Sequence, residues 1–205
     1  MTGDCPECGN RLENYVNRYL GNDVPLCHTC EFGYKAFFMG AVAGVKKVYG
    51  VEEEKLKEFL TYKFNRRAIL NIARGVIEYG LQEPLRPRAP IMIVWNVTNA
   101  CNLNCIHCYE KARRKRPDEL TTTEALDFID QIANFGVAAV SFAGGEPLLR
   151  KDLDQLIERC SDYGIFTAIA TNGTLLTLER AKQLKKAGAD YIEVSIDSID
   201  EKQHD

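Results

Sequence analysis

Three cysteines lie within eight residues, at Cys101, Cys105 and Cys108, in the spacing C-x3-C-x2-C. The apolar run over residues 91–97 comes directly before them and predicts a buried strand. The thiols are therefore expected on a loop at the carboxyl end of that strand. Three thiolates on one short loop can hold three irons of a cubane cluster and leave the fourth iron open to a small molecule, whereas ferredoxin-type clusters use four cysteines.

Three further motifs follow predicted strands in turn. They are Gly-Gly-Glu-Pro-Leu at 144–148, Ala-Thr-Asn-Gly at 170–173 and Ser-Ile-Asp-Ser at 195–198. Together with the cysteine triplet, and in this order, they resemble the radical S-adenosylmethionine (SAM) superfamily over residues 91–205. The resemblance is specific for the superfamily and says nothing about which member this is.

After residue 90 the pattern alternates between strand and helix. An order βαβαβαβ implies a parallel sheet, and ligands of such sheets lie at the carboxyl ends of the strands. We predict an α/β fold, a partial parallel (β/α) barrel of the radical SAM type with four βα units. The resemblance implies six strands, so the chain is expected to be the front part of a longer enzyme. The predicted strands lie near 91–97, 138–142, 165–170 and 191–196, and the helices near 121–135, 150–163 and 177–188.

The resemblance also implies a chemistry for the matching positions. The cysteine triplet would ligate a 4Fe–4S cluster whose open iron chelates SAM. One electron would then cleave SAM reductively to methionine and a 5′-deoxyadenosyl radical, which abstracts hydrogen from substrate. The cofactor-binding positions are Gly144, Gly145 and Glu146 for the amino group, Pro147 to fix that turn, His107 near the adenine, Thr171 and Asn172 nearby, and Ser195 and Asp197 for the ribose.

Two C-x2-C pairs precede this region, Cys5 with Cys8 and Cys27 with Cys30, and 18 residues separate them. Four thiolates brought together make a closed tetrahedral site that suits structural zinc. Four thiolates also hold a single iron, so the sequence predicts a metal and leaves zinc and iron open. The segment would act as a zinc-ribbon-like knuckle that docks a partner, relays electrons or simply holds the terminus together.

The order of segments suggests four parts. Residues 1–31 form the metal-binding knuckle, and helical periodicity marks 32–82 as a connector. Residues 83–90 contain three prolines, which disfavour helix and central strand, so they read as an extended linker at the domain boundary. Residues 91–205 form the radical SAM core.

The composition limits the class of protein and the cell compartment that can be expected. The 205 residues are 45% hydrophobic and 27% charged, with a net charge of −3, which argues against a nucleic-acid-binding or membrane-surface protein. The longest near-apolar run, 36–45, is too short to span a bilayer. Seven of eight cysteines fall in metal-type clusters, which favours a reducing cytoplasm. The expected partners are a small-molecule or peptide substrate and an electron donor such as ferredoxin or flavodoxin.

Two other readings remain open. One is an iron–sulfur electron carrier that binds no SAM, although a carrier has no use for the Gly-Gly-Glu-Pro turn. The other is a catalytically incomplete fragment that serves as a metal-binding adaptor. The basic run over residues 111–116, just after the cysteines, reads as a solvated loop. Its position also suits contact with a phosphate-bearing substrate or an acidic electron donor.

Overall fold

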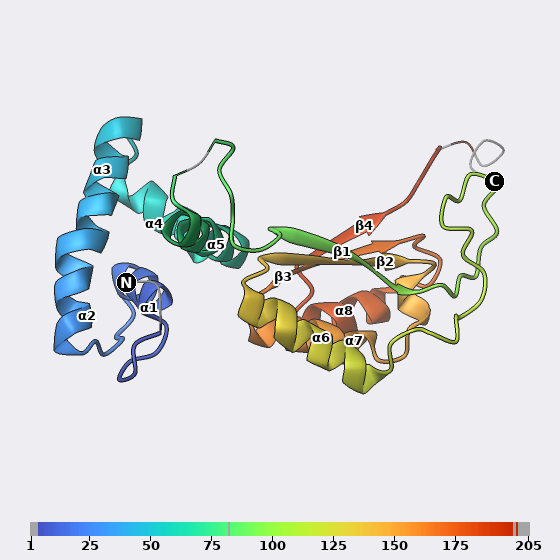
Figure 1. Cartoon of the computed structure of the whole chain (residues 1–205). Coiled ribbons are helices and arrows are strands. Elements are labelled where there is room, and N and C mark those ends of the chain that lie inside the picture. Colours follow the sequence, from blue (N-terminus) through green and yellow to red (C-terminus); the bar gives the residue numbers. More distant parts are fainter. Residues whose placement is uncertain (1–3, 82, 199, 201–205) are drawn as a thin grey trace. The chain divides into compact units, whose positions relative to one another are not determined.

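The computed structural model describes residues 4–81, 83–198 and 200, and the chain divides into two compact units. One unit spans residues 1–89 and the other spans 90–205. Figure 1 traces both along the chain, and each is described here by itself.

The first unit is helical. Its elements are α1 (Arg11–Tyr19), α2 (His28–Gly33), a π-helical turn (Tyr34–Phe38), α3 (Met39–Tyr49), α4 (Glu53–Thr61) and α5 (Lys63–Tyr79). The helices α2 and α3 run on through the π-helical turn as one rod in Figure 1. Val16 and Tyr19 of α1 pack with Leu60 of α4 and Leu70 of α5 in the buried centre of this unit.

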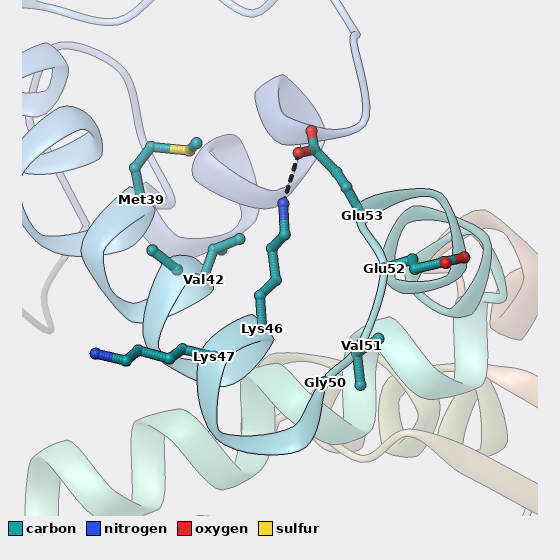
Figure 2. A pocket seen from close by; sticks show the side chains of 9 residues that line it. Met39, Val42, Lys46, Lys47, Gly50, Val51, Glu52 and Glu53 are labelled. Carbon is teal, nitrogen blue, oxygen red and sulfur yellow. Dashed lines mark hydrogen bonds and ion pairs between the residues drawn. The ribbon is translucent and has the colours of Figure 1, made fainter.

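The corner between α3 and α4 holds a pocket of about 490 Å³, shown in Figure 2. Gly50 ends α3 in the left-handed conformation, at φ 63°, as glycine does most readily. Lys46 Nζ lies 3.0 Å from Glu53 Oε2 at the mouth of the pocket. This ion pair links the last turn of α3 to the start of α4.

The proline-rich segment is attached to α5. The buried side chain of Asn71 donates to the Ala89 carbonyl at 2.9 Å and accepts from the Ala89 N–H at 2.8 Å. Gly75 lies directly beneath the main chain of residues 86–88, where a Cβ would meet the Arg86 carbonyl oxygen at 2.2 Å. These contacts fasten the segment to the first unit.

The second unit is an α/β layer. Four parallel strands, β1 (Met92–Thr98), β2 (Ala139–Gly144), β3 (Phe166–Thr171) and β4 (Tyr191–Val194), form one sheet in the order β1-β2-β3-β4. The helices α6 (Thr122–Phe135), α7 (Leu153–Asp162) and α8 (Leu178–Ala187) cover one face of it in Figure 1. This confirms the predicted alternation and the parallel sheet.

Alternate residues of each strand form the core beneath the helices. Trp95, Phe142 and Ile169 point to this side, and the Trp95 ring meets Phe128 of α6 with centroids 4.8 Å apart. Helix α6 begins with a full capping box, in which Thr121 and Glu124 bond each other's main-chain N–H. These contacts fix the strand ends that carry the candidate site.

On the other face of the sheet, the central strands β2 and β3 carry the small residues Ser141, Ala143, Ala168 and Ala170, flanked by larger residues on β1 and β4. The register places Asn96, Ala143, Ala170 and Glu193 in one row across this face. Strand β4 ends at Val194, two residues before the predicted end, and Ile196 is 66% exposed. The strand is therefore shorter than predicted, and Ile196 lies beyond its end.

No helix in the described part of the chain is long and apolar enough to cross a membrane.

Candidate functional site

The loop that carries the cysteine triplet leaves β1 and is closed at its root. Cys101 N–H donates to the Arg113 carbonyl at 3.4 Å, next to a bridge between Ala100 and Arg113. The Glu119 carboxylate accepts from Asn99 N–H at 2.7 Å and from Arg116 N–H at 2.9 Å. Burial opposes ionisation of Glu119, yet these two N–H groups hold its pKa below the usual value. Residues 99–119, here called the cluster loop, are therefore tied into a closed loop.

The three thiols of the cluster loop are free and accessible. Cys101 and Cys108 are partly buried, and Cys105 is exposed. Cys101 Sγ accepts a hydrogen bond from Leu103 N–H at 3.4 Å. Their sulfurs do not gather within 4.8 Å of one another, as those of the amino-terminal cysteines do. A cubane places each cysteine on its own iron, whereas a single ion draws its ligands together, so this donor set fits a cluster.

The Gly-Gly turn at the end of β2 is pressed against the cluster loop. Gly145 N–H donates to the Thr98 carbonyl, and Glu146 N–H donates to the Ala100 carbonyl, both at 2.8 Å. A Cβ on Gly144 would meet the Thr98 oxygen at 2.4 Å, and one on Gly145 would meet the Ala100 oxygen at 2.2 Å. Glycine is required at both positions because the two main chains approach each other so closely. The sequence had suggested a different reason, namely that the glycines let a ligand approach the main chain.

Glu146 is wholly buried, with protein donors on both oxygens of its carboxylate. Oε1 accepts from Leu148 N–H at 2.9 Å and from Thr171 Oγ1 at 2.8 Å, and Oε2 accepts from Asn172 N–H at 2.8 Å. The sequence offered two acceptors for the SAM amino group, nearby main-chain carbonyl groups or this carboxylate. The structure instead uses it to join the end of β2 to the end of β3, because a buried carboxylate needs such donors.

A second polar link joins the cluster loop to the turn after β3. Asn102 Nδ2 donates to Thr174 Oγ1 at 2.7 Å, and Asn172 Nδ2 donates to Asn102 Oδ1 at 3.0 Å. Thr174 in turn donates to Asn172 Oδ1 from its main-chain N–H at 3.0 Å. Sequence reasoning missed Asn102 and Thr174. Their only signal was an amide directly after the first cysteine and a Thr-Asn-Gly-Thr turn, both of which favour local hydrogen bonds.

The remaining predicted ligand positions meet at the same edge. His107 Nε2 lies 3.2 Å from Asp197 Oδ2, so the cluster loop touches the segment after β4. Ser195 N–H donates to the Thr171 carbonyl at 2.9 Å and extends the pairing of β3 and β4. Pro147 is buried at the start of a 3₁₀ turn, Pro147–Leu149. All the predicted residues of the second unit therefore lie on the loops at one end of the sheet.

Replacing Asn102 with alanine is expected to loosen the cluster loop. The change removes two side-chain hydrogen bonds, which are worth about 1 kcal/mol each at most when exposed. Amide hydrogen exchange of residues 101–108 should then quicken by about tenfold, the factor for ~1.4 kcal/mol. Asn65→Ala removes a similar exposed bond, to the Phe59 carbonyl, and is the control. Equal exchange in the wild type and N102A would contradict the role given to this link.

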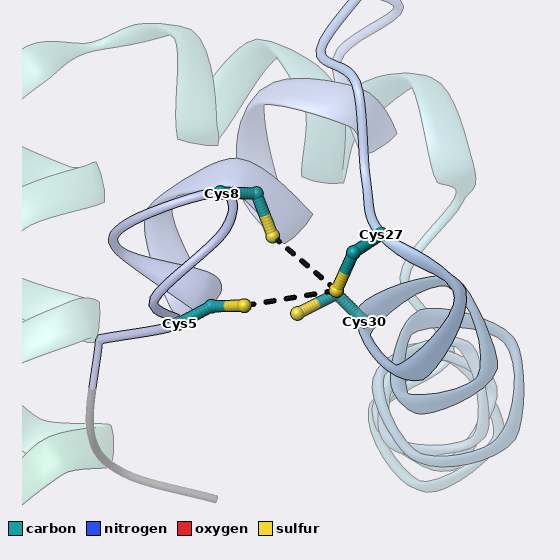
Figure 3. Close-up of side chains that lie close together, drawn as sticks. All are labelled: Cys5, Cys8, Cys27 and Cys30. Carbon is teal, nitrogen blue, oxygen red and sulfur yellow. Dashed lines mark hydrogen bonds between the residues drawn. The ribbon is translucent and has the colours of Figure 1, made fainter.

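The amino-terminal cysteines form a separate centre in the first unit. The sulfurs of Cys5, Cys8, Cys27 and Cys30 lie within 4.8 Å of one another, and Figure 3 shows them turned toward a common point. Cys27 Sγ lies 3.6 Å from Cys5 Sγ and 3.8 Å from Cys8 Sγ. The turn closes through paired main-chain bonds between Cys5 and Gly9. This is the compact four-thiolate arrangement that a single tetrahedral ion requires.

The surroundings of these four thiols differ. Main-chain N–H groups of Glu7 and Cys8 lower the pKa of the Cys5 thiol to about 6, so this ligand is prepared as a thiolate. Burial raises the pKa of Cys30 to about 12, so this thiol needs a cation beside it to ionise. Interaction with the Cys5 sulfur raises the pKa of Arg11. Arg11 thereby supplies one positive charge beside a centre of four negative ligands.

The fold and the site define a parallel α/β protein with a three-cysteine loop at the carboxyl edge of its sheet. The sequence model of the Radical SAM superfamily matches residues 95–205, more than half of the chain. The chain therefore belongs to the radical SAM superfamily. Its relatives carry the names of enzymes, as the sequence predicted.

Curated relatives match the same segment. The chain is 45% identical over 111 residues to Fe-coproporphyrin III synthase of Methanosarcina barkeri, covering 54% of this chain and 28% of that protein. It is 43% identical over 118 residues to the AdoMet-dependent heme synthase of the same organism, covering 57% and 34%. It is 37% identical over 108 residues to mycofactocin maturase MftC of Mycolicibacterium smegmatis, covering 53% and 27%. The chain thus spans about a third of the length of these relatives.

Solved structures agree on the fold. SuiB of Streptococcus suis bound to precursor peptide SuiA aligns with 95% of this chain and 43% of its own, at 20% identity and a TM-score of 0.56. SuiB bound to S-adenosylmethionine aligns with a TM-score of 0.55 at 21% identity. This supports the partial barrel predicted from the sequence.

Proposed function

We propose that this chain provides the SAM-cleaving core of a radical SAM enzyme. Cys101, Cys105 and Cys108 would hold a 4Fe–4S cluster. One observation carries the proposal: the cluster loop is fastened to the turns after β2 and β3, so the motifs of the family meet at one edge of the sheet. When bound, the cluster supplies an open iron for SAM and the electron that cleaves its carbon–sulfur bond to yield a 5′-deoxyadenosyl radical.

The residues of this chain would position the reactants. Buried Glu146 holds the two turns together, and the Gly144–Gly145 main chain offers carbonyl groups beside the cluster loop. His107 and Asp197 meet where the adenosine would lie, with Ser195 next to them along the edge. The small side chains of Ala143 and Ala170, on the sheet face opposite the helices, leave room for the ligand. The cofactor would supply the radical chemistry, and the protein would orient the cofactor.

The relatives indicate where substrate choice is made. Their names cover heme synthesis and mycofactocin maturation, and SuiB was solved with a precursor peptide. Since one core accompanies such different products, we assign the shared radical-generating step to this chain. Selection of a small-molecule or peptide substrate is assigned to regions outside the matched segment, and a reducing ferredoxin or flavodoxin in the cytoplasm would supply the electron.

The proposal is tested by anaerobic reconstitution with iron and sulfide, followed by electron paramagnetic resonance of the reduced protein. A cubane signal that changes when SAM is added is expected for the wild type. Replacing any one of Cys101, Cys105 and Cys108 with serine should abolish that signal, because each serves a separate iron. Cys160→Ser is the control, since Cys160 is a buried thiol of α7. A signal indifferent to SAM would favour the electron-carrier reading.

A further inference from the structure

The basic run after the cysteines is held directly against the cluster loop's first ligand. The Arg113 carbonyl accepts from Cys101 N–H, and the bridge to Ala100 fixes the neighbouring residue. Ala112 is buried, at 1% exposure, and anchors the run to the protein. The side chains of Lys111, Arg113 and Arg114 are exposed on either side of this anchor. The run is therefore a fixed surface beside the cluster.

The local charge is opposite to that of the whole chain. Residues 110–119 contain five cations and three carboxylates, whereas the net charge of the chain is −3. The three carboxylates are occupied: Glu110 accepts from Asn96, Asp118 pairs with Arg116, and Glu119 takes the main-chain bonds at the loop's root. Among the described residues no ion pair is recorded for Lys111, Arg113 or Arg114, so their charges face the solvent.

The shape of this surface suits a protein. A hollow of about 580 Å³ adjoins the basic run, and both Lys115 and Lys151 line it, together with the acids Glu119 and Asp152. Thr98 and Ala100, the residues that lead to Cys101, line the same hollow. Lys111 has φ 49°, a left-handed conformation that costs a lysine free energy and is concentrated at functional sites. A partner bound in this hollow would contact Ala100, the residue directly before the first cluster ligand, Cys101.

We propose that Lys111, Arg113, Arg114, Lys115 and Lys151 form the docking surface for an acidic, protein-type one-electron donor. The inference rests on the proposed function, because it needs a cluster at Cys101. The donor is oxidised by one electron, the cluster is reduced by one, and no covalent bond changes. Complementary charge raises the rate of encounter chiefly at low salt, and the short path to Cys101 favours transfer once the donor is bound.

The test compares two variants with the same change of charge. The triple variant K111Q/R113Q/R114Q neutralises the proposed surface. The control K182Q/K185Q/K186Q neutralises three exposed lysines of α8. Each protein, with its cluster reconstituted, is mixed in stopped flow with reduced flavodoxin at 20 mM and 300 mM salt as chosen conditions, about a fourfold change in Debye length. Bleaching of the cluster absorbance gives the second-order rate constant.

At low salt we expect the loop variant to be reduced about tenfold more slowly than the wild type and its salt dependence to flatten, while the control stays within about twofold. Equal rates in the wild type and the loop variant would overturn the proposal, as would equal losses in the two variants. Photoreduction with 5-deazaflavin must reach the same end point in all three proteins. If the photoreduced cluster does not respond to SAM, the proposed function is wrong, whereas the result on donor docking remains valid.

A phosphate-binding role is the competing outcome. Pyrophosphate is titrated against the melting temperature of the wild type and the loop variant. If pyrophosphate stabilises only the wild type while flavodoxin reduces both at one rate, the surface is an anion site and the donor proposal is wrong.

Discussion

Replacing Gly145 with alanine is expected to displace the cluster loop and to abolish most cluster binding. The added Cβ would lie 2.2 Å from the Ala100 carbonyl oxygen and 2.7 Å from its carbon. These are main-chain atoms, so no side chain can turn away to make room. The bond from Glu146 N–H to that same oxygen would break as the chains separate. Such overpacking destabilises a protein by about 3 kcal/mol.

Iron and sulfide content after reconstitution, together with thermal unfolding followed by circular dichroism, measures the effect of G145A. The matched control is Gly164→Ala. Gly164 has φ 65° and open space around its Cβ position, so alanine there strains the main chain by about 1 kcal/mol but meets no atom. Both variants should melt earlier, and only G145A should lose iron. Full iron occupancy in G145A would show that the contact between the turn and the cluster loop is dispensable.

The framework of the second unit was predictable because its signals are local. Apolar runs predicted the four strands, and the predicted helix near 121–135 corresponds to α6. The sequence motifs also gave the edge of the sheet where the site lies, since parallel strands present their carboxyl ends together. What the motifs could not give was the partner of each side chain. Glu146 looked like a ligand, and only the tertiary fold shows that Thr171 and Asn172 occupy its carboxylate.

The end of the sheet was less predictable for a physical reason. The sequence predicted a strand near 191–196, yet β4 ends at Val194 and Ile196 is exposed. Alternation reports which side chains share a face, but burial depends on what lies against that face. The link through Asn102 was missed for a related reason: hydrogen bonds between loops 70 residues apart leave no periodic trace in a sequence.

Removing the metal from the amino-terminal cysteines is expected to unfold the segment that contains α1 and α2. Helix α1 has nine residues and is too short to persist alone in water, and α2 supplies only the first six residues of a rod that continues into α3. Among the described residues, the buried hydrophobic cluster of this unit includes Val16 and Tyr19 of α1, packed with Leu60 of α4 and Leu70 of α5, and no residue of α2. A single ion that joins Cys5 and Cys8 to Cys27 and Cys30 closes this segment, and the binding free energy of such an ion, roughly 10 kcal/mol, becomes folding free energy.

The measurement combines metal analysis with limited proteolysis. Purified protein should contain one zinc or one iron per chain in addition to the cluster iron, and C30S should lack it. Cleavage within residues 4–31 should accelerate by about a hundredfold or more in C30S and in chelator-treated wild type, because several kcal/mol of local stability are lost. Cys160→Ser, which changes a buried thiol outside both metal centres, should keep the ion and the slow cleavage. If C30S loses the ion but resists protease like the wild type, the helices hold the terminus unaided, and the four cysteines must then be retained for electron relay or for docking.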